Sequence, residues 1–199
     1  MQILTDYWYL WLVLAGLILL LIWSSKKAFA AVKKHSEIVT RERAYLERFT
    51  MLTKKYRDLD HNLAERSDAA ELMEGVTACL QREIEKAPVR LEAFNSAEEW
   101  RRKVYAVYYF TEDAGKSLSE YFRNNTEPTA GLAVGLIRDI CPERLSRIVN
   151  EMYSMYDSDN DRVSYDPKRI EELDAQFAKE YDKTDFCRDV KTFILENIS

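Results

Sequence analysis

A long apolar run near the N-terminus is the feature that most constrains the fold of this chain. Residues 7–23 read YWYLWLVLAGLILLLIW, and with Ser24 and Ser25 they form 19 consecutive uncharged residues. As a helix, such a run is roughly 28 Å long at about 1.5 Å per residue, which matches the hydrocarbon thickness of a bilayer. Aromatic residues stand at both ends, where their rings would meet lipid headgroups. The sequence therefore predicts a short external tail and one transmembrane helix over residues 1–25.

The charges that flank this run predict its orientation. Only Asp6 precedes it, whereas four lysines follow closely: Lys26, Lys27, Lys33 and Lys34. Because positive charge stays on the cytoplasmic side, we expect a single-pass protein of the cell membrane, with the N-terminus outside and the C-terminal domain in the cytoplasm. The missing basic residue before the run argues against a cleaved signal peptide, although residues 28–30 (AFA) resemble a cleavage site.

Charge divides the rest of the chain into two parts. Residues 25–57 hold ten Lys/Arg against three Asp/Glu, whereas residues 58–199 hold nineteen against thirty. We expect residues 26–66 to form a basic juxtamembrane helix, and residues 7–34 to contact membrane lipid, including anionic headgroups. A solvated helix face is the alternative for the basic stretch. The acidic remainder argues against direct binding of nucleic acid.

A short heptad pattern lies within the juxtamembrane segment. Its apolar members step by three and four residues: Phe49, Leu52, Tyr56, Leu59 and Leu63, extended backward by Tyr45 and Ile38. This spacing predicts a short coiled-coil seam. The seam can pair two chains in a homodimer or pack on the protein's own domain, and the sequence leaves both alternatives open.

Residues 67–199 are predicted to form a compact, acidic, all-α domain. Apolar stripes with helical spacing cover residues 145–156, 170–181 and 186–194, and no alternating run indicates a strand. Ser96-Ala97-Glu98-Glu99 matches a capping box before the stripe that starts at Trp100. Asp166-Pro167 matches a helix start, with Asp at the N-cap and Pro at the first helical position.

The stretch DSDNDRVSYDPK, residues 157–168, opens like a calcium loop. An EF-hand loop needs a glycine at its sixth position and a bidentate carboxylate at its twelfth, but Arg162 and Lys168 stand there. We therefore expect a solvated acidic loop. Seven carboxylates fall within residues 157–174, a density that suits a cationic partner. The predicted partner-binding residues are Asp157, Asp159, Asp161, Glu171, Glu172 and Asp174.

Residue types that carry catalysis are sparse. The three cysteines, Cys79, Cys141 and Cys187, are widely spaced, as expected of reduced thiols in the cytosol. Two histidines offer no zinc-site spacing, and the five glycines form no phosphate-binding loop. Glu112 and Asp113 beside Gly115 are the best candidates for acid–base work. We expect no enzyme, no metal and no cofactor.

Two segments carry a family resemblance. Residues 104–124 read VYAVYYFTEDAGKSLSEYFRN, and residues 172–177 read ELDAQF. Over residues 68–199 this order and spacing resemble the bacterial all-helical family typified by DNA mimic protein nineteen. The matching motif positions are Glu112, Gly115, Tyr121, Phe122 and Asn124. The family pattern has two glycines and a Phe at the turn, whereas this chain keeps only Gly115.

The resemblance implies a function in protein binding. Members of the DNA-mimic type are acidic dimers that occupy the DNA-binding face of a transcription factor. From the sequence we expect a membrane-anchored cytosolic interaction module that binds a basic protein partner. The alternatives are an immunity-type or structural membrane protein and, less favoured, an enzyme.

Overall fold

The computed structural model describes Leu17 and residues 39–115, 117–157, 162–163 and 166–198. The chain divides into two compact units, Met1–Arg48 and Phe49–Ser199. Apart from Leu17, the predicted transmembrane run lies outside the described residues, and none of the helices within them is long and apolar enough to cross a bilayer. The predicted membrane span and topology therefore stay predictions.

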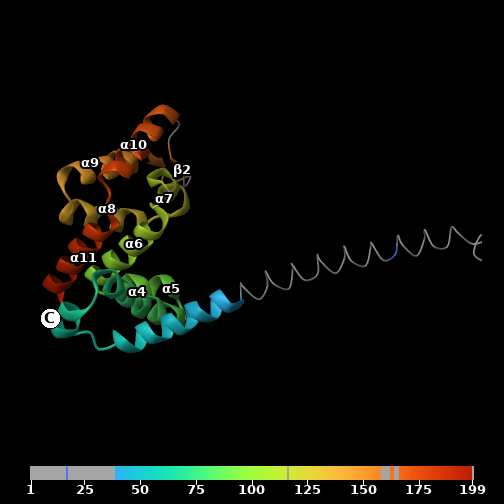
Figure 1. The fold of residues 1–199 in the computed structure, drawn as a ribbon, viewed down its shortest axis with the longest axis vertical. Coiled ribbons are helices and arrows are strands. Elements are labelled where there is room, and N and C mark those ends of the chain that lie inside the picture. Colours follow the sequence, from blue (N-terminus) through green and yellow to red (C-terminus); the bar gives the residue numbers. More distant parts are fainter. Residues whose placement is uncertain (1–16, 18–38, 116, 158–161, 164–165, 199) are drawn as a thin grey trace, which may run out of the picture. The chain divides into compact units, whose positions relative to one another are not determined.

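The second unit is all-helical apart from one very short strand pair (Figure 1). Residues 39–55 are helical and lead into it. The helices that follow are α3 (His61–Arg66), α4 (Ala69–Lys86), α5 (Arg90–Ser96), α6 (Glu99–Asp113), α7 (Leu118–Asn124), α8 (Thr129–Ile140), α9 (Glu143–Ser154), α10 (Pro167–Glu180) and α11 (Lys183–Asn197). Strands β1 (Tyr156–Asp157) and β2 (Arg162–Val163) pair antiparallel, with Tyr156 opposite Val163. The predicted compact all-α domain is confirmed.

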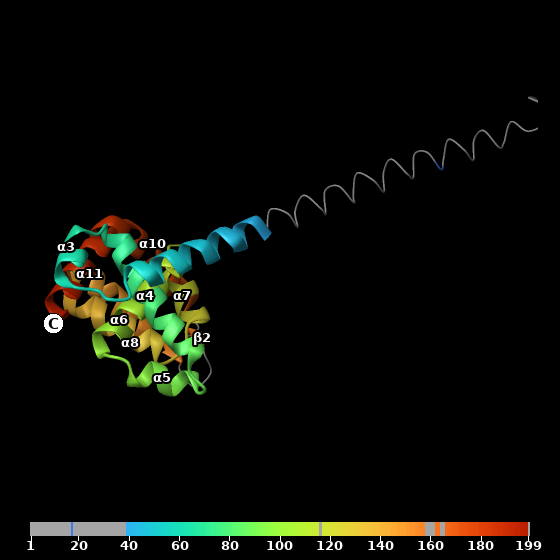
Figure 2. The same cartoon turned by 90° about the horizontal axis from the view of Figure 1, so that it is seen from below.

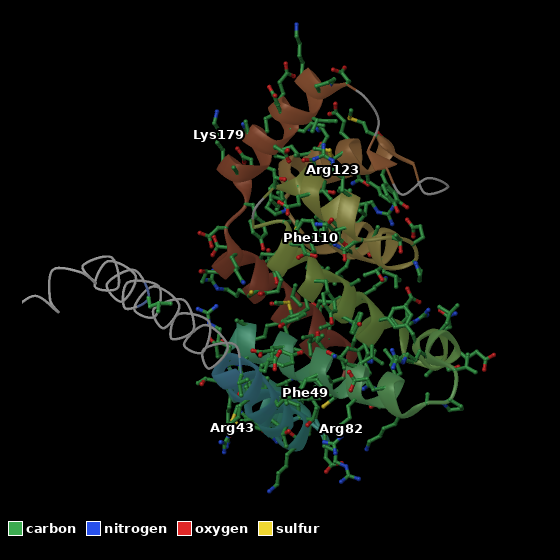
Figure 3. All side chains as sticks on the ribbon, turned by 90° about the vertical axis from the view of Figure 1, so that its right-hand side faces the viewer. Arg43, Phe49, Arg82, Phe110, Arg123 and Lys179 are labelled. Carbon is green, nitrogen blue, oxygen red and sulfur yellow. The ribbon has the colours of Figure 1, made fainter. Side chains whose placement is uncertain are left out.

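Helix α6 forms the centre of the hydrophobic core, and α4, α8 and α11 pack against it. Phe110 on α6 is fully buried, as its position in Figure 3 shows. Its ring contacts four aromatic rings, from α7, α10, the α10–α11 connection and α11, at centroid distances of 4.9 to 6.0 Å: Tyr121, Phe177, Tyr181 and Phe186. Such aromatic packing joins segments that are distant in sequence and fixes their mutual positions.

The heptad seam packs within the chain. Leu52 and Tyr56 are only 1% and 2% exposed, and Phe49, Leu59 and Leu63 pack against the same core. The intramolecular alternative therefore accounts for the seam from Phe49 onward. The compact unit also begins at Phe49, so residues 49–66 belong to it and not to a separate juxtamembrane helix. That segment is broken after residue 55, before α3 begins at His61.

Aspartate is the N-cap residue of four helices in the described part of the chain. Asp60, Asp68, Asp166 and Asp182 accept backbone N–H groups at the starts of α3, α4, α10 and α11, as N-cap carboxylates do. The predicted start at Asp166-Pro167 is confirmed. The predicted capping box at Ser96 is wrong, because Ser96 is the last residue of α5 and α6 starts at Glu99 without a side-chain cap.

Helix α11 closes the unit. It packs against α3, α4, α6 and α8, and it buries Phe186, Val190 and Ile194. Lys191 on its outer side donates hydrogen bonds to the carbonyl oxygens of Glu65 (2.8 Å) and Ser67 (2.6 Å) at the end of α3. These carbonyls have no partner inside α3, so the lysine satisfies them and ties α11 to α3.

Candidate functional site

A cationic groove lies between residues 50–57 and α4. Figure 2 shows these two segments side by side. We call it the basic groove, and its volume is about 470 Å³. Eight residues line it: Thr50, Thr53, Lys54, Arg57, Cys79, Arg82, Glu83 and Lys86. Its size falls within the range of small-molecule sites, which is about 300–1,000 Å³.

The groove exists because one aromatic residue, Tyr56, docks residues 49–57 onto α4. The ring of Tyr56 lies over Gly75, where an added Cβ would come within 2.6 Å of ring atoms Cγ and Cε2. The Tyr56 hydroxyl hydrogen-bonds Glu71 at 3.1 Å. Glycine is therefore required at position 75 for the two helices to approach this closely.

Thr53 organises the floor of the groove. Its hydroxyl lies 3.0 Å from the carbonyl oxygens of Phe49 and Thr50, and it accepts a hydrogen bond of 3.1 Å from Arg82 Nη1. The Cys79 thiol lies 3.8 Å from the Thr53 carbonyl oxygen, and partial burial raises the pKa of this thiol. Thr53 is buried, so it directs the Arg82 guanidinium across the groove from below.

The groove carries an excess of positive charge. Lys54 comes from the helix over residues 39–55, Arg57 from the turn after it, and Arg82 and Lys86 from α4, and all four are exposed. Glu83 is the one carboxylate among the eight lining residues, and Arg101 holds it through two hydrogen bonds of 2.7 and 3.0 Å. Among the residues that the structure describes, Lys54, Arg57 and Lys86 have no ion-pair partner. The groove can therefore attract an anion.

The predicted acidic site is only partly described. Asp159 and Asp161 lie outside the described residues, and Asp157 is known only as backbone in β1. Glu171 and Glu172 are exposed on α10. The structure brings Glu172 near Glu151 of α9, because both form ion pairs with Arg169.

Asp174 differs from its neighbours on α10. Its two carboxylate oxygens accept hydrogen bonds from the Ser119 backbone N–H (2.9 Å) and hydroxyl (2.7 Å). The carboxylate thus joins α10 to the first turn of α7, where Ser117 is the N-cap. Asp174 is predicted to contact a partner, and that contact stays a prediction; the structure shows that its carboxylate also has an internal role.

The five motif residues that carry the family resemblance lie in different surroundings, some in the core and some on the surface. Glu112 forms an ion pair with Lys183 at 3.0 Å, and Gly115 follows the end of α6. Tyr121 and Phe122 are fully buried in the core, whereas Asn124 is exposed. Burial raises the pKa of Tyr121, so its hydroxyl stays protonated at neutral pH. We find no carboxylate pair poised for acid–base work here, since Glu112 faces a lysine on the surface.

A second polar group lies beside these motif residues. The Tyr153 hydroxyl donates a hydrogen bond of 2.6 Å to Glu127, and this bond, with partial burial, raises the pKa of Tyr153 to about 12. Asn125 donates to Asp113 at 2.9 Å. Both contacts tie chain segments near α7 to their neighbours. In the part of the chain that the structure describes, no cluster of His, Cys, Asp and Glu is placed to hold a metal ion.

The groove cations on α4 were missed by the sequence reasoning. Arg82 and Lys86 are four residues apart on α4, so they share one helix face. That spacing was a usable signal. Lys54 lies in the last turn of the helix over residues 39–55, and Arg57 lies in the turn that follows. What the sequence did not reveal is that the contact of Tyr56 with Gly75 brings these two pairs of cations together.

Comparisons with known proteins give no match: no family model, no curated protein and no solved structure is significantly similar to this chain.

Proposed function

We propose that the protein is a membrane-anchored interaction module whose acidic α9–α10 end binds a cationic protein partner in the cytoplasm. The anchor is the apolar run of residues 7–25. The binding surface comprises the acidic loop of residues 157–166 together with Glu151, Glu171 and Glu172. A DNA-binding protein is the partner class that the resemblance to the DNA-mimic family favours.

The observation that carries this proposal is the position of the acidic surface within the compact unit. In Figure 3 Phe49, where the chain enters the unit, lies at one end with Arg82, and Lys179 of α10 lies at the other. The acidic α10 end is therefore remote from the segment that connects to the proposed anchor. A surface placed in this way stays open to a partner that approaches from the solvent.

Electrostatics supports the same proposal. Residues 58–199 carry thirty Asp/Glu against nineteen Lys/Arg, so a cationic partner is attracted over distance. Exposed charges are screened beyond about 8 Å at physiological ionic strength, so binding of such a partner weakens as salt rises. At the described part of the surface, Arg169 forms ion pairs with Glu151 and Glu172, and Glu171 is exposed.

The test captures partners with the full-length protein in detergent. Wild type is compared with a triple variant, Asp157→Asn, Asp159→Asn and Asp161→Asn, at two salt concentrations. A control removes three exposed carboxylates at the other end: Glu65→Gln, Glu92→Gln and Glu98→Gln. We expect a basic protein to be retained by wild type and control, and lost with the triple variant. Equal retention by all three would remove the acidic end as the binding surface.

A further inference from the structure

We propose that the basic groove is a binding site for a phosphate-bearing ligand. This inference is independent of the proposed protein partner, because it concerns the opposite end of the unit and the opposite charge. Four cations, Lys54 and Arg57 from one chain segment and Arg82 and Lys86 from α4, surround a groove of about 470 Å³. Phosphate oxygens are strong acceptors and favour sites where several Lys or Arg donors converge.

The donors of the groove are arranged for an oxyanion. Thr53 holds Arg82 at 3.1 Å through its buried hydroxyl, which limits the rotamers of the guanidinium. A guanidinium held in place loses less conformational entropy when it binds a phosphate by two parallel hydrogen bonds. Lys54, Arg57 and Lys86 add positive charge around it, and the Thr50 hydroxyl adds a neutral donor.

Arg101 keeps the one opposing charge of the groove neutralised. It lies on α6 and is not one of the lining residues, yet it binds both carboxylate oxygens of Glu83. A bidentate pair of this kind holds the carboxylate in one orientation. The field inside the groove is therefore set by the four cations, and Arg101 acts as a positioning residue for Glu83.

The phosphate can belong to a phospholipid headgroup or to a soluble compound, and two titrants distinguish these sources. Calorimetry is performed on the full-length protein in a neutral detergent. One titrant is inorganic pyrophosphate, and the other is a water-soluble short-chain phosphatidic acid. Tighter binding of the phosphatidic acid identifies a lipid headgroup, and tighter binding of pyrophosphate identifies a soluble ligand.

Matched variants connect this binding to the groove. We expect Arg82→Gln with Lys86→Gln to weaken binding of the better titrant roughly tenfold, as expected when two exposed cations stop contributing. The control, Arg123→Gln with Lys179→Gln, removes two exposed cations at the other end of the unit in Figure 3 and should leave affinity unchanged. Lys54→Gln with Arg57→Gln repeats the test from the other side of the groove.

Substitutions of Glu83 and of Arg101 should change the affinity in opposite directions. Glu83→Gln removes the negative charge and should tighten binding several-fold, whereas Arg101→Gln exposes the carboxylate and should weaken it. Thermal unfolding of each variant verifies that it is folded. The proposal is overturned if neither titrant binds wild type, or if the groove variants and the control pair change affinity equally.

Discussion

The carboxylate of Asp174 on α10 accepts two hydrogen bonds from Ser119 on α7, one from the backbone N–H at 2.9 Å and one from the hydroxyl at 2.7 Å. These residues are 55 positions apart, so the contact joins distant parts of the chain. It gives one member of an acidic cluster two partners inside the protein. A charge that looks like part of a binding surface in the sequence thus contributes to the fold.

Replacing Asp174 by Ala is expected to destabilise the domain by about 1–3 kcal/mol, because the N–H and hydroxyl of the buried Ser119 lose their acceptor. Urea unfolding of the full-length protein in detergent measures the change. Glu171→Ala on the same helix is the control, since Glu171 is exposed, and it should change stability by less than about 0.5 kcal/mol. Similar losses in both variants would contradict the internal role of Asp174.

Gly75 of α4 and Gly135 of α8 should respond in opposite directions to substitution by alanine. Gly75→Ala places a methyl group against the Tyr56 ring and is expected to cost several kcal/mol, of order 3, as overpacked cores do. Gly135→Ala meets no atom within 4 Å and should stabilise α8 by up to about 1 kcal/mol. Thermal unfolding measures the stability of the two variants against wild type. A neutral Gly75→Ala would show that residues 49–57 are not held on α4 by this contact.

Alkaline pH should destabilise the protein through Tyr153. An unfolded tyrosine ionises near pH 10, whereas its bond to Glu127 keeps folded Tyr153 protonated until about pH 12. Between these values the folded state binds more protons, so the free energy of unfolding falls as pH rises. Tyr153→Phe should make this decline shallower in urea titrations from pH 9 to 11. An identical decline in wild type and variant would assign it to other groups.

The native thiols should react slowly with a membrane-impermeant maleimide. Cys187 is 3% exposed, and burial raises the pKa of all three cysteines, that of Cys141 to about 12. A topology test therefore needs an added exposed thiol, such as Glu171→Cys. We expect this variant to be labelled only after cell lysis, as the proposed cytoplasmic domain requires. Rapid labelling on intact cells would place the domain outside.

Leu52 and Met51 are neighbours that face opposite environments. Leu52 is 1% exposed and Met51 is 50% exposed. Leu52→Ala should destabilise the domain by about 2–5 kcal/mol, the usual range for a buried leucine, whereas Met51→Ala should be nearly neutral. Denaturant unfolding at several protein concentrations measures the free energy of unfolding of both variants. A concentration-dependent loss only for Leu52→Ala would instead indicate that the seam pairs two chains.

Local signals in the sequence predicted the helices well, and contacts between distant residues limited the rest. The apolar stripe of α10 and its start at Asp166-Pro167 depend on neighbours within one turn, so both could be predicted. Ser96 satisfies the same local rule but ends α5, because Phe94 is buried in the core and holds that short helix together. Nothing in the local sequence distinguishes the two cases.

The acidic surface and the basic groove also differ in how much of each could be predicted from the sequence. Glu171 and Glu172 are exposed, as expected for a partner surface, but the partner of Asp174 is 55 residues away and could not be inferred from spacing. The basic groove depends on the close approach of Tyr56 to Gly75, a tertiary contact between residues 19 positions apart. A rule that considers one helix at a time finds the cations but not the groove.

The tie between α11 and α3 has a consequence for biosynthesis. Phe186, Val190 and Ile194 complete a core that α4, α6 and α8 cannot close without them, and Lys191 joins the end of this assembly to its beginning. On the ribosome the nascent domain stays open until these residues emerge, long after residues 7–25 have been translated. Insertion of the proposed anchor would therefore precede folding of the domain, whose apolar faces on α4, α6 and α8 stay uncovered in the interval.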